Sequence, residues 1–370
     1  MKKGWEMRKL GAICEISTGN ANTEDAIENG EFAFFDRSKT IKRSSSYLFD
    51  CEAIIIAGEG QTFLPKFYSG KFNLHQRAYA IYNFNKNVDI QYVNNYLIHF
   101  HKYFEQVAVG ATVKSLRLRH FQELPIPIPP RPEQQRIVSI LDEAFAAIAK
   151  AKANAEQNLK NAKELFESFM RGVFENKGES WEEKYLGEMI EIKNGKNQQA
   201  VLSENGKYKV MGSAGNLMGY ATDFICEAGT TIIGRKGNIS KPIYINERFW
   251  NVDTAFGFYP KNEKDMDKRF IYYLCLGIDF KSMNRGTTIP SLVKSELQTI
   301  QISFPKSLKA QQAIVQKLDA VSAETKKLEG IYQQKINDLE ELKKSVLQKA
   351  FSGELRGGEP VEPKTNALAV

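Results

Sequence analysis

An internal repeat of about 177 residues constrains this chain more than any other feature. Residues 133–142 read EQQRIVSILD and residues 310–319 read AQQAIVQKLD, so six of ten positions are identical at a spacing of 177. The repeat also relates GWEMRKLGAICEISTGN (4–20) to SWEEKYLGEMIEIKNGK (180–196), and GATVKSL (110–116) to GTTIPSL (286–292). A unit of this length is a duplicated domain and not a solenoid repeat.

Each copy of the repeat is expected to end in a long helix. The prolines of LPIPIPPRPEQQ (124–135) exclude a helix before Pro132, and the next helix-breaking residue is Gly172. The first helix is expected to run from Pro132 to about Phe174, which gives about 42 residues, or roughly 60 Å of helix. A second helix is expected from about Lys309 to Phe351, with apolar residues close to heptad spacing.

Helices this long exceed the width of the globules they follow, since a domain of about 120 residues has a radius of gyration near 14 Å. We therefore expect the two helices to pair as an antiparallel coiled coil. The alternative is that each helix only covers its own globule. The residues expected in the coiled coil or in subunit docking are Gln134, Gln135, Ile137, Leu141, Ile148, Leu165, Phe169, Gln311, Gln312, Ile314, Leu318, Val321, Leu328, Leu339 and Leu342.

The predicted fold class is α+β, with two mixed, β-rich globular domains separated by the two helices in a pseudo-twofold repeat. Apolar β-branched runs such as CEAIIIAGEG (51–60) and GTTIIGRKG (229–237) indicate strands, and residues 89–104 and 267–280 indicate one helix in each globule. The predicted domains are a first globule at 1–130, a spacer helix at 131–178, a second globule at 179–305, a second spacer helix at 306–355 and a disordered tail at 356–370.

The sequence offers little that indicates catalysis. GTTIIGRK (229–236) resembles a phosphate-binding loop but has Arg235 where that motif needs lysine, and TTII favours a strand. His99 and His101 are two positions apart on an expected helix, so they point in different directions and do not predict a metal site. We expect no enzyme activity, metal or cofactor in this chain.

Basic and polar loops are the remaining candidates for a functional surface. The net charge of +7 is weak evidence for a polyanionic partner, but the loops cluster at matching places of the two copies. Arginine and lysine neutralise phosphates, and Ser or Thr can contact phosphates and base edges. The predicted DNA-binding residues are Arg37, Lys39, Lys42, Arg43, Arg77, Lys114, Arg117, Arg119, Arg235, Lys236, Arg285, Thr287, Thr288, Ser291 and Lys294.

Localisation follows from what the sequence lacks. There is no apolar run of about 18 residues, and no apolar segment follows the basic N-terminus. The four cysteines (Cys14, Cys51, Cys226 and Cys275) are scattered, without a CxxC pair. A cytoplasmic protein, not bound to a membrane, is expected.

The repeated frame resembles the specificity subunit of type I restriction–modification systems. The resemblance rests on W-x-x-x-x-L-G at the start of each globule and on LPIPIPPRPEQQRIVSILD (124–142), and it spans about residues 4–355. The second copy, ISFPKSLKAQQAIVQKLD (302–319), lacks the Pro-Pro pair and the Glu.

The resemblance implies two target recognition domains that read the two halves of a split double-stranded DNA target. It also implies docking of two methyltransferase subunits, which bind S-adenosylmethionine and methylate adenine, and of motor-nuclease subunits through them. The globules differ outside the frame, so an asymmetric target is expected. Two alternatives remain: a related fused or standalone modification system, and a coiled-coil scaffold whose globules bind peptide or sugar.

Overall fold

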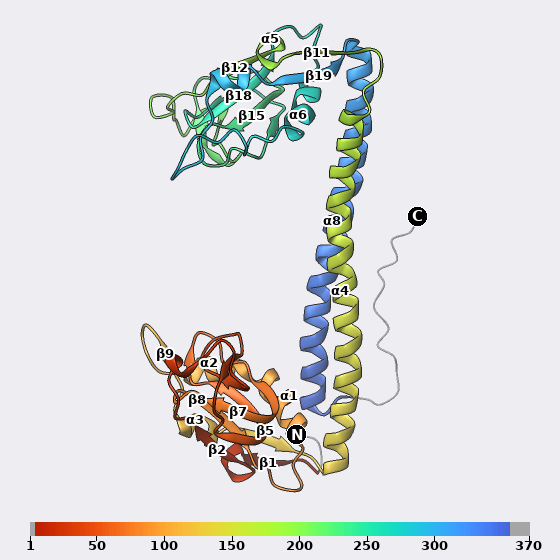
Figure 1. Ribbon diagram of the computed structural model, residues 1–370. Helices are drawn as coiled ribbons and strands as arrows, with labels where there is room; N and C mark the ends of the chain where they lie inside the picture. The colour runs from red at the N-terminus through yellow and green to blue at the C-terminus, as the bar shows by residue number, and fades with distance from the viewer. Residues whose placement is uncertain (1–3, 356–370) are drawn as a thin grey trace. The chain divides into compact units, whose positions relative to one another are not determined.

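The computed structural model describes residues 4–355, so the tail predicted at 356–370 lies outside the described residues. The chain divides into two compact units (Figure 1). Unit 1 contains the described residues up to Ala155 and from Gln334 onward, and unit 2 spans Glu156–Gln333. Along the chain the elements form a globule, a long helix, a second globule and a second long helix, and each compact unit combines one globule with parts of both long helices.

The globule of unit 1 is built on a six-stranded sheet covered by short helices. The strand order is β2 (Glu15–Thr18), β8 (Ala78–Tyr82), β5 (Phe49–Ala57), β7 (Lys66–Leu74), β3 (Phe32–Phe35) and β4 (Lys42–Ser44), and only β3 and β7 are parallel. Two small antiparallel pairs are β1 (Glu6–Lys9) with β10 (Pro125–Ile128) and β6 (Glu59–Gly60) with β9 (Lys114–Ser115). The helices are α1 (Ile90–His99), α2 (His101–Val107) and α3 (Leu118–Gln122), with 3-10 turns at Leu10–Ala12 and Thr23–Asp25.

The globule of unit 2 repeats this plan with its sheet divided in two. One sheet has the order β12 (Ile190–Asn194), β18 (Ala255–Pro260), β15 (Thr230–Gly234) and β16 (Ile243–Ile245). The other has the order β14 (Leu217–Ala221), β13 (Tyr208–Met211) and β17 (Phe249–Asn251), with β13 and β17 parallel. A further antiparallel pair is β11 (Trp181–Tyr185) with β19 (Gln301–Pro305), and the helices are α5 (Leu186–Met189), α6 (Lys268–Leu276) and α7 (Lys294–Gln298).

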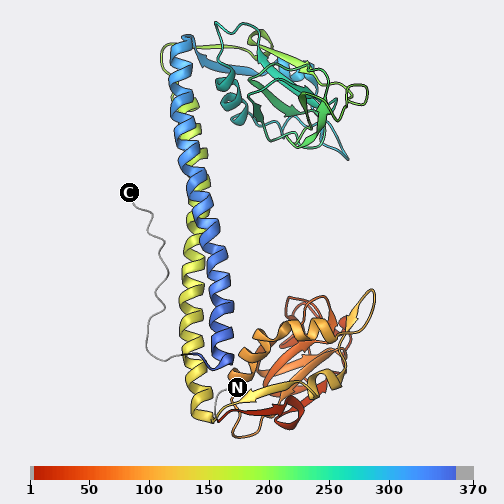
Figure 2. The same cartoon turned by 180° about the vertical axis from the view of Figure 1, so that it is seen from behind.

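The two long helices are α4 (Arg131–Glu175) and α8 (Leu308–Ser352), each of 45 residues. The start of α4 belongs to unit 1 and its end to unit 2, whereas α8 starts in unit 2 and ends in unit 1. Within unit 1 the helices run antiparallel, since Arg136 bonds to the carbonyl of Leu355 at 3.0 Å and Lys152 pairs with Glu340 at 2.7 Å. Both views show α4 and α8 side by side in this unit (Figures 1 and 2).

A buried glutamine explains why the QQ motif occurs at the start of both long helices. Gln134 is fully buried, and its Oε1 accepts a hydrogen bond from the backbone N–H of Asp89 at 2.8 Å. Its Nε2 donates to the carbonyls of Asn87 (3.0 Å) and Pro129 (2.8 Å). One side chain thus ties the helix start to the segment that follows β10 and to the segment that begins α1.

Gln311 makes the same three contacts in unit 2. Its Oε1 accepts from the N–H of Asp267 at 2.8 Å, and its Nε2 donates to the carbonyls of Asp265 and Pro305, both at 2.9 Å. Asp267 also caps α6 with its carboxylate, as Asp89 caps α1. The duplicated motif therefore fixes each globule to the long helix that follows it.

The end of the other long helix packs against the same globule. In unit 1 the ring of Phe351 lies 5.5 Å from that of Tyr92 and 5.2 Å from that of Tyr96. In unit 2 the matching residue, Phe174, lies 5.7 Å from Phe270. Each globule therefore buries the start of one long helix and the end of the other.

The predicted seam residues occupy several environments. Ile137, Leu141, Ile148 and Leu318 are buried, and Phe169, Ile314, Val321, Leu328, Leu339 and Leu342 are partly buried. Gln135 and Gln312 are exposed, and Leu165 is 54% exposed, so Leu165 lies outside the packed seam. Thr325, a polar residue in the apolar stripe, is buried, and its hydroxyl is satisfied by donating to the carbonyl of Val321 at 2.9 Å.

The shorter helices differ from the prediction at their ends. The helix expected at 89–104 is divided at Phe100, whose φ of −97° and ψ of 9° separate α1 from α2. The helix expected at 267–280 stops at Leu276, because Gly277 forms its C-cap. None of the helices in residues 4–355 is long and apolar enough to cross a membrane.

Replacing either buried glutamine should destabilise the fold. Gln134→Ala or Gln311→Ala leaves one N–H and two carbonyls without a partner, at a cost of about 1–3 kcal/mol for each group that stays buried. We expect the free energy of unfolding, measured by urea titration, to fall by about 2 kcal/mol or more. The neighbouring exposed residues provide controls, since Gln135→Ala and Gln312→Ala should change stability by less than about 0.5 kcal/mol. Equal stability of Gln134→Ala and Gln135→Ala would contradict this account.

Candidate nucleic-acid interface

Three loops that carry predicted basic residues meet where β5 ends in unit 1. The N–H of Gly58 donates to the carbonyl of Arg77 at 2.7 Å, and the carbonyl of Gly58 accepts from the N–H of Leu116 at 2.8 Å. The chain then continues into β6, which pairs with β9. The third loop begins at Asp36, directly after β3, and approaches through the side chain of Arg37.

Glu59 is the residue on which these loops converge. Its carboxylate, whose side chain is 9% exposed, pairs with Nη1 of Arg77 and accepts from Oγ of Ser115 at 3.2 Å. Nη1 of Arg37 lies 3.6 Å from the other carboxylate oxygen. Burial alone raises the pKa of this carboxyl, but the hydrogen bonds from Arg77 and Ser115 and the two arginine charges outweigh it and lower the pKa.

A second buried carboxylate, Asp36, holds the basic loop that follows β3. Asp36 pairs with Lys42 at 2.7 Å and accepts from the N–H of Ser38 at 2.7 Å. Lys66 donates to the carbonyls of Ser38 and Lys39, each at 3.0 Å. Burial raises the pKa of Asp36, but the hydrogen bonds from Lys42 and Ser38 lower it by more.

The remaining basic residues predicted in unit 1 lie on β4, on β9 and at the start of α3. Arg43 donates to the carbonyl of Gly30 at 2.9 Å, and Lys114 donates to that of Glu105 at 2.9 Å. Arg117 and Arg119 are exposed at the start of α3. Arg37, Arg77, Lys39 and Lys114 are likewise exposed, so the junction presents several cations to solvent.

Unit 2 forms the same backbone junction from the matching segments. The N–H of Arg235 donates to the carbonyl of Thr254 at 2.8 Å, and the carbonyl of Arg235 accepts from the N–H of Leu292 at 2.9 Å. Lys236 and Ser291 form a bridge where unit 1 pairs Glu59 with Ser115. Residues that correspond at a spacing of 176 or 177 therefore make the same two backbone hydrogen bonds in both units, but their side chains differ.

The other residues predicted in unit 2 surround this junction. Arg285 is exposed and pairs with Glu296 at 3.0 Å. Thr287 and Thr288 are exposed on the loop that Arg285 begins, and Lys294 is the first residue of α7. Arg235 lies over the ring of Phe256, with 6.0 Å between the guanidinium carbon and the ring centroid.

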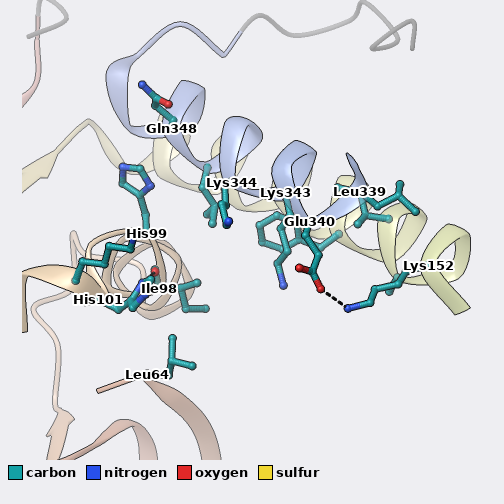
Figure 3. Close-up of a pocket in the computed structure, with 15 residues that line it drawn as sticks. Leu64, Ile98, His99, His101, Lys152, Leu339, Glu340, Lys343, Lys344 and Gln348 are labelled. Carbon is teal, nitrogen blue, oxygen red and sulfur yellow. Dashed lines mark hydrogen bonds and ion pairs between the residues drawn. The ribbon is translucent and has the colours of Figure 1, made fainter. Parts of the chain in front are cut away.

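A different surface lies in unit 1, where α1 and α2 face the α4–α8 pair. It is a cavity of about 570 Å³ with an apolar floor that includes Ile98, Phe145 and Leu347. Its rim carries Lys343 and Lys344, and Figure 3 shows Lys152 directed at Glu340. This groove contains no predicted DNA-binding residue.

Unit 2 has a matching groove of about 530 Å³ between the end of α4 and the end of α6. Its lining residues Phe166, Glu167, Met170 and Arg171 lie 177 positions before Lys343, Lys344, Leu347 and Gln348 of the first groove. The groove is therefore part of the repeat, although its charges are not.

Glu59, His75 and Ser115 were not predicted from the sequence. Glu59 is acidic, and a carboxylate that orients arginines does not have the basic or neutral polar chemistry expected of a residue that contacts DNA. The internal repeat contains the missing signal, since it aligns GEG (58–60) with RKG (235–237). Among residues 4–355, no group of three or more His, Cys, Asp or Glu side chains is arranged to hold a metal ion.

Comparison with known proteins gives consistent matches. A family described as "Type I restriction modification DNA specificity domain" matches residues 2–160 and 178–341. The type I restriction enzyme EcoDI specificity subunit of Escherichia coli is 24% identical over 405 aligned positions, covering 95% of this chain and 88% of that protein. The MjaIX specificity subunit of Methanocaldococcus jannaschii is 24% identical, covering 96% and 94%.

Solved structures share the fold. A chain from a structure on complex assembly and conformational transition of the type I R–M system aligns with a TM-score of 0.76 at 16% identity, covering 96% of this chain and 99% of that one. The HsdS subunit from Thermoanaerobacter tengcongensis aligns with a TM-score of 0.57 at 15% identity, covering 96% and 98%.

The ion pair of Asp36 should make the stability of unit 1 depend on pH. Because the pKa of Asp36 is lower when folded, its contribution is fully present above the unfolded pKa of about 3.9 and is lost as the pH falls through the folded value. Asp36→Asn should therefore destabilise the protein most near neutral pH and progressively less below about pH 4. Urea unfolding at several pH values measures this, with the exposed Asp50→Asn as control. A difference in unfolding free energy between Asp36→Asn and the wild type that does not change with pH would refute this role of Asp36.

Proposed function

The chain belongs to the type I restriction–modification DNA specificity family, and from this premise we propose that it selects the DNA target of a restriction–modification complex. Each globule reads one half of a bipartite sequence in double-stranded DNA. The observation that carries the proposal is the loop junction at the end of β5 and of β15. The two units share its backbone hydrogen bonds but place different side chains on it. Two readers with different side chains fit an asymmetric target.

The chemistry of the junction suits DNA. Exposed Arg37, Arg77, Lys114 and Arg117 can neutralise phosphates, and the arginines can also bond to guanine edges. In unit 2, Lys236 and the threonines at 287 and 288 offer a different set of donors and acceptors. Phosphate contacts place the protein on the duplex, whereas base contacts give the specificity.

The long helices serve as the spacer in this proposal. They pair as an antiparallel coiled coil with pseudo-twofold symmetry and set the gap between the half-sites. Support comes from their equal length of 45 residues and from the antiparallel contacts within unit 1. A fixed spacing between two reading elements imposes a fixed spacing on the target, as it does for dimeric DNA-binding proteins.

Two methyltransferase subunits are the proposed partners, and motor-nuclease subunits join through them. The methyltransferases hold S-adenosylmethionine and methylate adenine, so this chain carries no catalytic step. The duplicated grooves at the ends of α8 and α4 suit two copies of one partner, because they occupy equivalent positions in the repeat. The alternative of a scaffold for peptide or sugar ligands finds no support among the relatives.

Coexpression with a partner methyltransferase subunit tests the function. Long-read sequencing of the host genome should then show adenine methylation at a split, asymmetric motif with a fixed gap. The mass of the native complex should correspond to two methyltransferase subunits per chain. Absence of methylation from a complex that assembles and binds its methyl donor would overturn DNA recognition by these globules.

Changing helix length tests the spacer. A heptad inserted into both helices beside the Lys152–Glu340 pair adds about 10 Å of helix, or about three base pairs of duplex. We expect the gap in the methylated motif to lengthen while both half-sites keep their bases. A heptad inserted into α4 alone is the control and should abolish methylation, because it disrupts helix pairing. An unchanged gap in the double insertion would rule out the spacer role.

A further inference from the structure

We propose that Glu59 is a positioning residue that holds Arg77 and Arg37 as a guanine-reading pair, so that the half-site read by unit 1 contains guanine. This inference rests on the proposed function and adds to it the chemistry of one half-site. Arg77 is the main reader, because it hydrogen-bonds to Glu59, whereas Nη1 of Arg37 lies 3.6 Å away. Glu59 itself acts through the arginines and does not touch the base.

The distribution of exposure separates this cluster from an ordinary structural ion pair. The Glu59 side chain is 9% exposed, whereas those of Arg77 and Arg37 are 60% and 57% exposed. A buried carboxylate needs charged or hydrogen-bonding partners, and here these come from arginines whose outer parts remain in solvent. The buried carboxylate is thus hydrogen-bonded to one exposed arginine, Arg77, and lies 3.6 Å from Nη1 of a second, Arg37.

Donors remain available on both arginines. Each guanidinium uses Nη1 toward Glu59, and within residues 4–355 the structure gives Nε and Nη2 of Arg77 and Arg37 no other partner. A guanidinium presents five N–H donors in a planar fork, so one edge can be anchored while another binds a ligand. Such anchoring reduces the entropy lost when the fork binds.

The backbone of Arg77 is fixed from several directions. Its N–H donates to Nδ1 of His75 at 3.0 Å, and its carbonyl accepts from the N–H of Gly58 at 2.7 Å. His75 is itself buried, and its N–H donates to the carbonyl of Phe35 at 2.9 Å. Arg37 follows Asp36, which is held by Lys42. The arginines therefore start from rigid points of the sheet.

Unit 2 shows that this position is free to change while the junction is kept. Lys236 occupies the place of Glu59 and Thr254 that of Arg77, yet the backbone hydrogen bonds are the same. The junction therefore forms without the Glu59–Arg77 pair. The Glu59–Arg77 pair is thus not needed to form the backbone of the junction, and it lies within the proposed DNA surface. We assign it to base recognition.

Guanine is the base that this arrangement fits. O6 and N7 of guanine form two adjacent acceptors in the major groove, and an arginine fork matches both. A phosphate could accept from the same donors, but a phosphate contact gives no base preference. The two possibilities are therefore separated by measuring discrimination between bases, and not by affinity alone.

The experiment uses the full chain in its methyltransferase complex and determines the wild-type motif first. Duplexes are then made with 7-deazaguanine, which lacks the N7 acceptor, at each guanine of each half-site. Binding and methylation are compared for wild type, Arg77→Lys, Glu59→Gln and the control Glu52→Gln, which changes an exposed carboxylate on β5, the strand before Glu59. Arg77→Lys keeps the charge but loses the fork.

We expect one half-site to contain a guanine whose N7 matters, and Arg77→Lys to lower discrimination at that base by roughly 10- to 100-fold. Glu59→Gln should lower the same discrimination in part, whereas binding to nonspecific DNA should change little. Discrimination at the other half-site should stay at the wild-type level in every variant, which shows that the complex is folded. Glu52→Gln should behave as wild type.

The possible failures are distinguishable. A wild-type complex without a bipartite motif would overturn the proposed function, and the inference with it. A bipartite motif in which neither half contains an N7-dependent guanine would overturn the inference alone. Wild-type base discrimination in both Arg77→Lys and Glu59→Gln would also overturn the inference. An equal loss of affinity for all sequences would overturn it too, because it would assign Arg77 to a phosphate.

Discussion

The fold depends on one buried side chain used twice. Gln134 and Gln311 each accept from one backbone N–H and donate to two carbonyls, joining three segments at the start of a long helix. Because buried polar groups without partners are costly, all three segments must meet there. The globule thereby acquires a defined attachment to its helix. A repeat that lost this glutamine would keep its strands but not that attachment.

The end of the other long helix also packs against the globule of each unit. Phe351 packs on α1 in unit 1, and Phe174 packs on α6 in unit 2, so each globule also requires the end of the helix that starts in the other copy. Neither copy of the repeat can complete its core from its own residues. The duplication is thus a reciprocal exchange of helix ends, which explains why the compact units cut across the sequence order.

The sequence predicts features that depend on local chemistry or on the repeat. The prolines up to residue 132 place the start of α4 and the QQ motif marks both helix starts, whereas α4 continues past Gly172 to Glu175. The break at Phe100 is not predictable in this way, since neither Pro nor Gly lies there. Glu59 is missed for another reason: its partners Arg37, Arg77 and Ser115 come from three distant segments, and only the folded sheet brings them together.

The contrast between the frame and the loop junction has a steric origin. A Cβ atom added to Gly19 would lie 1.7 Å from the carbonyl oxygen of Leu74, and one added to Gly195 would lie 1.8 Å from that of Val252, so the frame cannot vary at these points without moving backbone. At the junction the backbone hydrogen bonds form in both units, although unit 1 has Glu59 where unit 2 has Lys236. A protein whose frame is rigid and whose surface charge can invert is able to change what it reads while keeping how it is assembled.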